Sequence, residues 1–246
     1  MNTKTILATI AAAALGFTAQ ATTYPGNLNT GFGGAIGLGS LTLTDNGTII
    51  SGTLTKGVAG NFDNALVLYI DSTAGGFANT SGFADGADGL RKAISGFDGG
   101  VNRSLMQFSG MSPDYAIGLS PSASSFGGLW GLANGGANSL NFITSVGLTP
   151  TGTATSATYT FSFNLADIGL TPGAGQTFSL FGTYVSESGF RSTEALPGND
   201  AGTQGWNPFL QTAFATYTTT PIPEPATLTL MGLSGLATLV AARRRK

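Results

Sequence analysis

Hydrophobic and polar residues alternate along several short segments of the chain. The clearest segment is residues 157–165, in which Tyr159, Phe161 and Phe163 alternate with threonine and serine. Because successive side chains of a β-strand point to opposite faces, this period of two predicts a strand with one buried and one solvent-exposed face.

Residues 41–44 repeat the alternation and are followed by Asp45, Asn46 and Gly47 before Thr-Ile-Ile at 48–50. An Asn-Gly pair tolerates the positive φ angles that tight turns require. The segment therefore predicts a β-hairpin.

Residues 65–70 are apolar at every position, which predicts a central strand covered on both faces. One short helix is expected at 86–94, a turn at 165–168, and strand with tight turns in the glycine-rich 127–136. Further strands are expected at 105–108, 115–119, 140–143, 178–185 and 213–217. Clusters of Gly, Pro, Asn and Ser separate these segments, so the predicted fold is all-β. It is a two-sheet antiparallel sandwich of jelly-roll or lectin-like character that spans residues 22–220.

The composition narrows the possible chemistry. The chain has no cysteine and no histidine, which excludes disulfides, thiol catalysis, histidine-based triads and the usual zinc sites. Without its two ends, the chain keeps five basic and eleven acidic side chains, a net charge of −6. Nucleic-acid binding requires a basic surface, so no nucleic-acid partner is expected.

Residues 1–21 have the layout of a secretory signal peptide. Lys4 gives a positive start, residues 6–17 are mildly apolar, and Ala19 and Ala21 supply the small side chains that a signal peptidase accommodates. Cleavage is expected after Ala21, which leaves Thr22 as the first residue of the exported protein.

The sequence of the C-terminal end predicts a membrane helix that is preceded by a processing motif. Pro223, Glu224 and Pro225 form an extended approach to residues 227–242, which carry no charge and would make a helix about 24 Å long. A basic cluster follows, and the positive-inside rule keeps it cytoplasmic. This cluster consists of Arg243, Arg244, Arg245 and Lys246.

The Pro-Glu-Pro motif, the apolar segment and the terminal arginines together resemble the PEP-CTERM sorting signal, here residues 221–246. The resemblance implies recognition by an exosortase, an integral membrane protease or transpeptidase. It also implies export by bacteria that make exopolysaccharide and envelope or biofilm matrix. The expected route is transient anchoring in the inner membrane, followed by transfer to the cell surface or extracellular matrix. A plain membrane anchor is the alternative.

Four aspartates in residues 71–98 are spaced by glycine and small polar residues: Asp71, Asp85, Asp88 and Asp98. Carboxylates in such loops can bind calcium, but the spacing does not match an EF-hand. The favoured interpretation is that these aspartates cap turns and the start of the short helix, and that no cofactor is bound.

Residues 185–209 are interpreted as a long loop and a possible ligand rim, formed by Glu187, Arg191, Glu194 and Trp206. Two of these carboxylates could act on a sugar bond if their separation were suitable. The favoured interpretation is a structural loop in which Arg191 pairs with an acid and Trp206 packs on the sandwich. Trp130 is expected in the core.

These observations favour a non-catalytic exported envelope or matrix protein, with binding of polysaccharide as a further hypothesis. The alternative is a carboxylate-based glycan hydrolase or lyase. A third hypothesis, an adhesin or ice-binding surface, needs a regular array of threonines, and the sequence shows no repeat of the required period.

Overall fold

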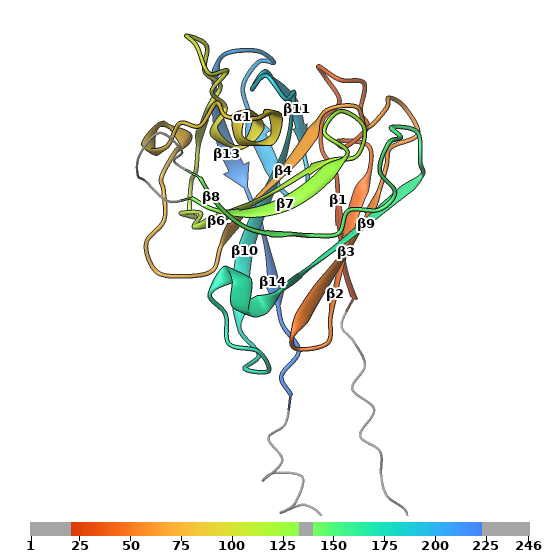
Figure 1. Cartoon of the computed structure of the whole chain (residues 1–246), viewed down its shortest axis with the longest axis vertical. Helices are drawn as coiled ribbons and strands as arrows, with labels where there is room; N and C mark the ends of the chain where they lie inside the picture. Colours follow the sequence, from red (N-terminus) through yellow and green to blue (C-terminus); the bar gives the residue numbers. More distant parts are fainter. Residues whose placement is uncertain (1–20, 133–139, 223–246) are drawn as a thin grey trace, which may run out of the picture.

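The computed structural model describes residues 21–132 and 140–222, and these residues fold mainly into β-strands (Figure 1). The helical elements are α1 (Gly89–Ser95) and the 3-10 turns η1 (Thr80–Gly82) and η2 (Leu165–Ile168). The strands are β1 (Ala21–Pro25), β2 (Ser40–Asp45), β3 (Ile49–Thr55), β4 (Ala65–Asp71), β5 (Leu105–Gln107), β6 (Tyr115–Ser120), β7 (Phe126–Gly131), β8 (Asn141–Ser145), β9 (Thr158–Asn164), β10 (Thr177–Val185), β11 (Arg191–Ala195), β12 (Asn199–Ala201), β13 (Pro208–Ala213) and β14 (Ala215–Thr218).

The strands form two large antiparallel sheets and one small mixed sheet. The first sheet has the order β1-β2-β3-β9, and the second has the order β11-β10-β4-β6-β7-β8, with β14 paired to β10. The small sheet has the order β12-β13-β5, in which β13 and β5 run parallel. The mostly antiparallel β architecture agrees with the predicted sandwich, but the small third sheet was not predicted.

The main core lies between the two large sheets. Leu41, Ile50 and Phe161 from the first sheet belong to the same buried cluster as Leu68 and Ile117 from the second. In each strand the side chains that face this core recur at every second position, because successive residues of a strand point to opposite faces.

A second core covers the other face of the seven-stranded sheet. Tyr69 and Trp130 from that sheet are buried in one cluster with Leu90 and Ile94 of α1 and with Phe209 of β13. The centre of the sheet is therefore covered on both faces, which explains why β4 is apolar at almost every position. The predictions of a central strand at 65–70 and of a buried Trp130 are confirmed.

Several local predictions are confirmed, with small shifts of the boundaries. β2 and β3 form the predicted hairpin, and Gly47 in its turn has a φ of 80°. β9 alternates between exposed and buried residues along its whole length. The helix α1 starts later than predicted, because Asp88 caps its N-terminus by accepting a hydrogen bond from the Arg91 N–H, and it ends at Gly96 with a φ of 66°.

The predicted loop at 185–209 is wrong, because this region contains β11, β12 and the start of β13. All five residues of β11 are buried although four of them are polar or charged. A strand packed on both faces shows no alternation, so its sequence does not distinguish it from a loop.

Candidate functional site

The outer face of the first sheet carries an ordered array of hydroxyl groups. The outward positions of β1, β2, β3 and β9 carry no charged side chain, and they are exposed or half-exposed. We call this surface the hydroxyl face. Its hydroxyl-bearing residues are Thr23, Ser40, Thr42, Thr44, Ser51, Thr53, Thr55, Thr158, Thr160 and Ser162.

Strand pairing aligns these residues in rows across the sheet. Thr23 lies opposite Thr42, Thr42 opposite Thr53, and Thr53 opposite Thr160. The hydroxyls of Thr23 and Thr42 are 2.8 Å apart and share a hydrogen bond. The rows on either side are Thr44-Ser51-Ser162 and Ser40-Thr55-Thr158. Standard sheet geometry spaces neighbours about 4.8 Å apart along a row and separates rows by about 6.8 Å.

The core beneath the sheet holds this array in place. Leu41, Leu43 and Leu54, which alternate with the outward residues, are fully or almost fully buried. Threonine is branched at Cβ and has few rotamers in a strand, so its hydroxyl is held in a narrow range of directions. Each hydroxyl can donate one hydrogen bond and accept others, which suits a neutral, hydroxyl-rich ligand.

The structure does not form the predicted ligand rim. Glu194 has 0% exposure, and its carboxylate accepts hydrogen bonds from the backbone N–H groups of Gly34, Ile36 and Gly37 at 3.1, 2.9 and 3.0 Å. Its role is to hold residues 34–37 against β11. The carboxylate is turned inward, away from any ligand that would approach from solvent.

Arg191 also has 0% exposure. Its Nη1 donates to the Thr183 hydroxyl at 2.8 Å, and its guanidinium lies over the Phe209 ring at 5.6 Å. Among the side chains that the structure describes, Arg191 forms no ion pair, and its observed partners include a hydroxyl group and an aromatic face.

Glu187 and Trp206 are half-buried. Trp206 packs edge-to-face against Phe190, with ring centroids 5.8 Å apart. The Glu187 Oε1 atom is buried and has no hydrogen-bond partner among the described residues. Two members of the predicted rim thus remain near the surface, and the other two lie inside the protein.

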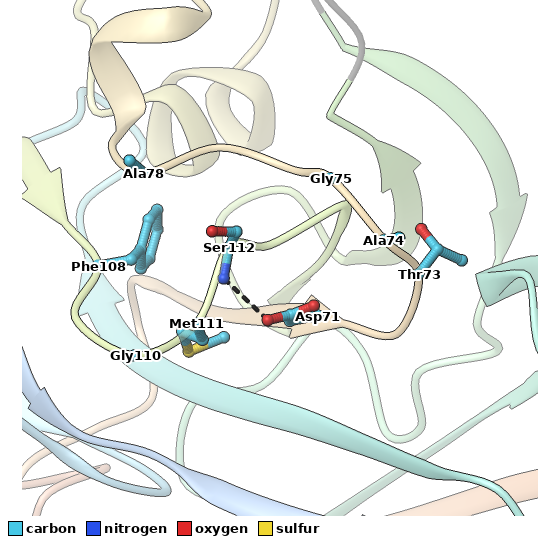
Figure 2. Close-up of a pocket in the computed structure, with 9 residues that line it drawn as sticks. All are labelled: Asp71, Thr73, Ala74, Gly75, Ala78, Phe108, Gly110, Met111 and Ser112. Carbon is cyan, nitrogen blue, oxygen red and sulfur yellow. Dashed lines mark hydrogen bonds between the residues drawn. The ribbon is translucent and has the colours of Figure 1, made fainter.

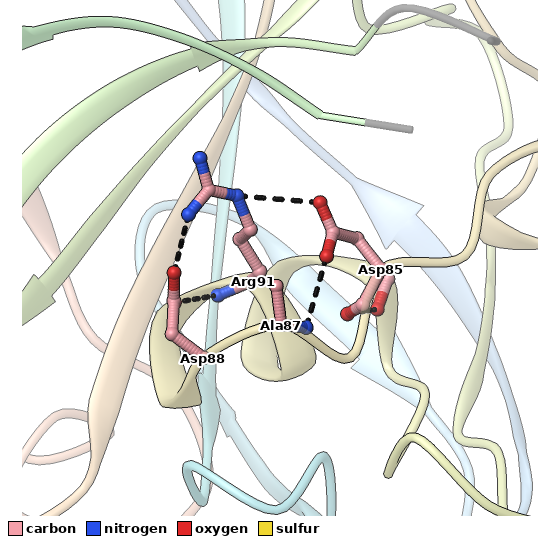
Figure 3. Close-up of polar contacts among 5 residues, drawn as sticks. Asp85, Ala87, Asp88 and Arg91 are labelled. Carbon is pink, nitrogen blue, oxygen red and sulfur yellow. Dashed lines mark hydrogen bonds and ion pairs between the residues drawn. The ribbon is translucent and has the colours of Figure 1, made fainter. Parts of the chain in front are cut away.

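Asp85 and Asp88 both contact Arg91 at the start of α1 (Figure 3). Asp85 is buried, lies 3.2 Å from the Arg91 Nε and accepts a hydrogen bond from the Ala87 N–H. Arg91 in turn lies over the ring of Trp130 at 5.9 Å. Asp88 caps the helix, and both carboxylates pair with the charge of Arg91.

Asp98 belongs to a separate turn. Its carboxylate accepts hydrogen bonds from the Gly100 N–H at 2.7 Å and from the Asn102 N–H and side chain, and these bonds lower its pKa. Within residues 21–132 and 140–222, no three Asp or Glu side chains form a group that could hold a metal ion. The four aspartates that were considered as an alternative calcium site are therefore not brought together into one.

Asp71 lines an open pocket of about 440 Å³ at the end of β4 (Figure 2). Burial raises the pKa of Asp71, the hydrogen bond from the Ser112 N–H at 2.8 Å opposes this shift, and the charge of Asp114 adds to it. The lining otherwise consists of small residues and of Phe108 and Met111. Asp71 is the one acid among the described residues that line the pocket.

Sequence reasoning identified the polar faces of single strands but not the array they form together. The alternation at residues 41–44 and 157–165 was visible, but the register that places Thr42, Thr53 and Thr160 in one row was not. Register depends on long-range pairing, and no short motif encodes it.

The predicted processing sites at the two ends are only partly described. Ala21 and Thr22 are the first residues of β1, and Thr22 lies opposite Leu43. Ala19, the Pro223-Glu224-Pro225 motif and the basic cluster 243–246 lie outside the described residues. Within the described ranges, the helices are too short or too polar to cross a membrane.

Comparison with curated proteins and with solved structures gives no match for the chain. The family comparison recognises the C-terminal tail alone. Residues 221–246 match the family model of the PEP-CTERM protein-sorting motif, which identifies the chain as an exported protein that carries an exosortase sorting signal.

Proposed function

We propose that the chain is a non-catalytic envelope or extracellular-matrix protein that binds neutral polysaccharide through the hydroxyl face of a lectin-like sandwich. Signal peptidase and exosortase are its processing partners, and the inner membrane anchors it only before processing. It needs no metal cofactor for this role.

The observation that carries the binding proposal is the alignment of the hydroxyl rows. A ligand with many hydroxyl groups can exchange hydrogen bonds with several rows at once, and an extended polymer can cross all four strands. The absence of charged side chains at the outward positions favours a neutral polymer over a phosphorylated or sulfated one.

Two features favour binding without catalysis. The buried carboxylate of Glu194 accepts hydrogen bonds from three backbone N–H groups and is inaccessible to a substrate. Glycoside hydrolysis ordinarily uses two carboxylates that flank the scissile bond, whereas the pocket beside β4 presents Asp71 alone among its described lining residues.

The proposal can be tested on the processed protein purified from its host. Binding to an array of neutral and acidic polysaccharides is measured together with the release of reducing ends. We expect binding to neutral polysaccharides without turnover. Turnover that Glu187→Gln abolishes would instead establish the alternative, a carboxylate-based hydrolase or lyase.

A triple variant, Thr42→Val, Thr53→Val and Thr160→Val, removes three of the four hydroxyls of the central row and keeps the shape of the side chains. Three lost hydrogen bonds at about 1 kcal/mol each predict binding about 100-fold weaker. The control is Thr177→Val with Thr218→Val, an exposed hydrogen-bonded pair on the other large sheet. Equal binding by both variants would contradict the assignment of the hydroxyl face.

The sorting role has its own test. Glu224→Ala changes the central residue of the Pro-Glu-Pro motif, and we expect this variant to accumulate in the membrane with its tail attached. Unchanged release, measured by mass spectrometry of the C-terminus, would show that the tail serves only as an anchor.

A further inference from the structure

The C-terminal segment of the domain is fastened to the β2–β3 turn by Asp45. This buried carboxylate accepts hydrogen bonds from the Tyr217 hydroxyl at 2.7 Å, the Thr220 N–H at 2.8 Å and the Thr220 hydroxyl at 3.1 Å. It also accepts one from the Gly47 N–H at 2.7 Å. One side chain therefore joins the turn to the segment that leads into the tail.

Hydrogen bonds hold the C-terminal segment to the domain as far as the last described residue, Ile222. The Ile222 N–H donates to the Gly173 carbonyl at 2.9 Å, and the Gly173 N–H donates to the Gly47 carbonyl at 2.6 Å. A Cβ on Gly47 would lie 2.5 Å from the Ile222 side chain, so the turn and Ile222 are in direct contact. The PEP-CTERM match begins at Pro221, so its first two residues are part of the folded domain.

This arrangement leaves almost no linker between the domain and the processing motif. Glu224 follows Ile222 by two residues, and at about 3.5 Å per residue the two Cα atoms lie within about 7 Å of each other. The uncharged segment begins at Thr227, which the chain can place at most about 18 Å from Ile222. An enzyme that grips the motif must therefore touch the domain.

The surface that such an enzyme would meet is small and uncharged. We call it the C-terminal pole. Ile222, at the centre of the pole, is 47% exposed. The exposed residues of the pole are Asn46, Thr171, Pro172, Ala174, Pro221 and Ile222. A neutral, partly apolar surface suits contact with a membrane-embedded protein close to the lipid interface better than a charged surface would.

We propose that the C-terminal pole is the surface on which the exosortase docks while it processes the tail. The folded domain is then part of the substrate together with the motif. This inference rests on the proposed processing of the tail and adds a second recognition element to it.

The test compares tail removal in the native host for two arginine substitutions. Ala174→Arg places a large cation on the pole, and Val58→Arg places the same cation at a fully exposed position beyond the far end of β3. Pulse–chase labelling with mass spectrometry of the C-terminus gives the processing rate. We expect Ala174→Arg to slow processing about tenfold, and Val58→Arg to leave it unchanged.

A second pair of variants separates docking from effects on folding or export. A flexible linker of about ten Gly and Ser residues between Ile222 and Pro223, with a root-mean-square length of about 17 Å, moves the motif away from the pole. With this linker, Ala174→Arg should no longer change the rate.

Native-rate processing of Ala174→Arg would overturn the inference, as would an equal slowing in the linker background. If the unsubstituted protein keeps its tail, the proposed processing fails and the inference fails with it. The unsubstituted protein thus distinguishes that case from a failure of docking alone.

Discussion

Glu194 gives the sharpest test of how the described structure is held together. Replacing it with alanine removes the acceptor of three backbone N–H groups in residues 34–37, at a site with 0% exposure. If Glu194 instead served as an exposed rim or acid–base residue, the same substitution would leave stability almost unchanged.

The expected loss of stability follows from the number of orphaned donors. A buried N–H without a partner costs about 1–3 kcal/mol, and three of them set a range of about 3–9 kcal/mol. The lower part of this range applies because the space left by the carboxylate can admit water. We therefore expect Glu194→Ala to lower the free energy of unfolding by about 4 kcal/mol, a large share of the 5–15 kcal/mol typical of folded domains.

Urea unfolding of the processed protein measures this loss. With a slope of about 2 kcal/mol per molar urea, a loss of 4 kcal/mol moves the midpoint down by about 2 M. Glu187→Ala is the matched control. Its buried Oε1 has no hydrogen-bond partner among the described residues, so its removal breaks no hydrogen bond at that atom and should not lower the midpoint by more than about 0.5 M. A shift that small for Glu194→Ala, at unchanged slope, would refute the structural role of Glu194.

Three further predictions concern Asp45, Gly47 and Asp71. Asp45→Ala should lower the free energy of unfolding by about 2–4 kcal/mol and speed amide hydrogen exchange at Thr220, which mass spectrometry can follow. Unchanged exchange would contradict the role of Asp45 in holding the C-terminal segment. Gly47→Ala should destabilise by about 1–2 kcal/mol more than Gly152→Ala in urea, because both glycines have positive φ but only a Cβ at position 47 meets a neighbour. Burial raises the pKa of Asp71, so the ionised carboxylate destabilises the folded state. Asp71→Asn should therefore raise Tm at pH 7. This gain should vanish as the pH falls below the usual aspartate pKa of about 3.9, where the carboxyl group is protonated in both states. An equal gain at every pH would contradict that reasoning.

The elements that could be predicted from the sequence are those whose pattern is local. β9 alternates because one of its faces meets the core, and the β2–β3 hairpin is marked by Asn46 and Gly47 in its turn. β4 was recognisable as a central strand because both of its faces are covered. In each case the pattern of apolar and polar residues within one segment indicates which of its faces are buried, so no knowledge of the rest of the fold is required.

β11 could not be predicted because the groups that accommodate its buried charged side chains cannot be recognised in its own sequence. Glu194 is compatible with burial only because residues 34–37 present three N–H groups to it, and Arg191 only because Thr183 and Phe209 lie beside it. A strand of buried polar residues looks like a surface loop until its partners are known. The predicted ligand rim followed from that ambiguity together with the carboxylates and the aromatic residues of the segment.

The β2–β3 turn links the two surfaces that we propose for function. A slip of one residue between β2 and β3 would put Thr42 and Thr53 on opposite faces of the sheet and would turn the leucines of one of the two strands outward, so the core and the hydroxyl rows depend on the same register. The turn that sets this register also carries Asp45 and Gly47, which hold the C-terminal segment in place. A change in the turn should therefore disturb binding and processing together, whereas Thr53→Val should affect binding alone and Ala174→Arg processing alone.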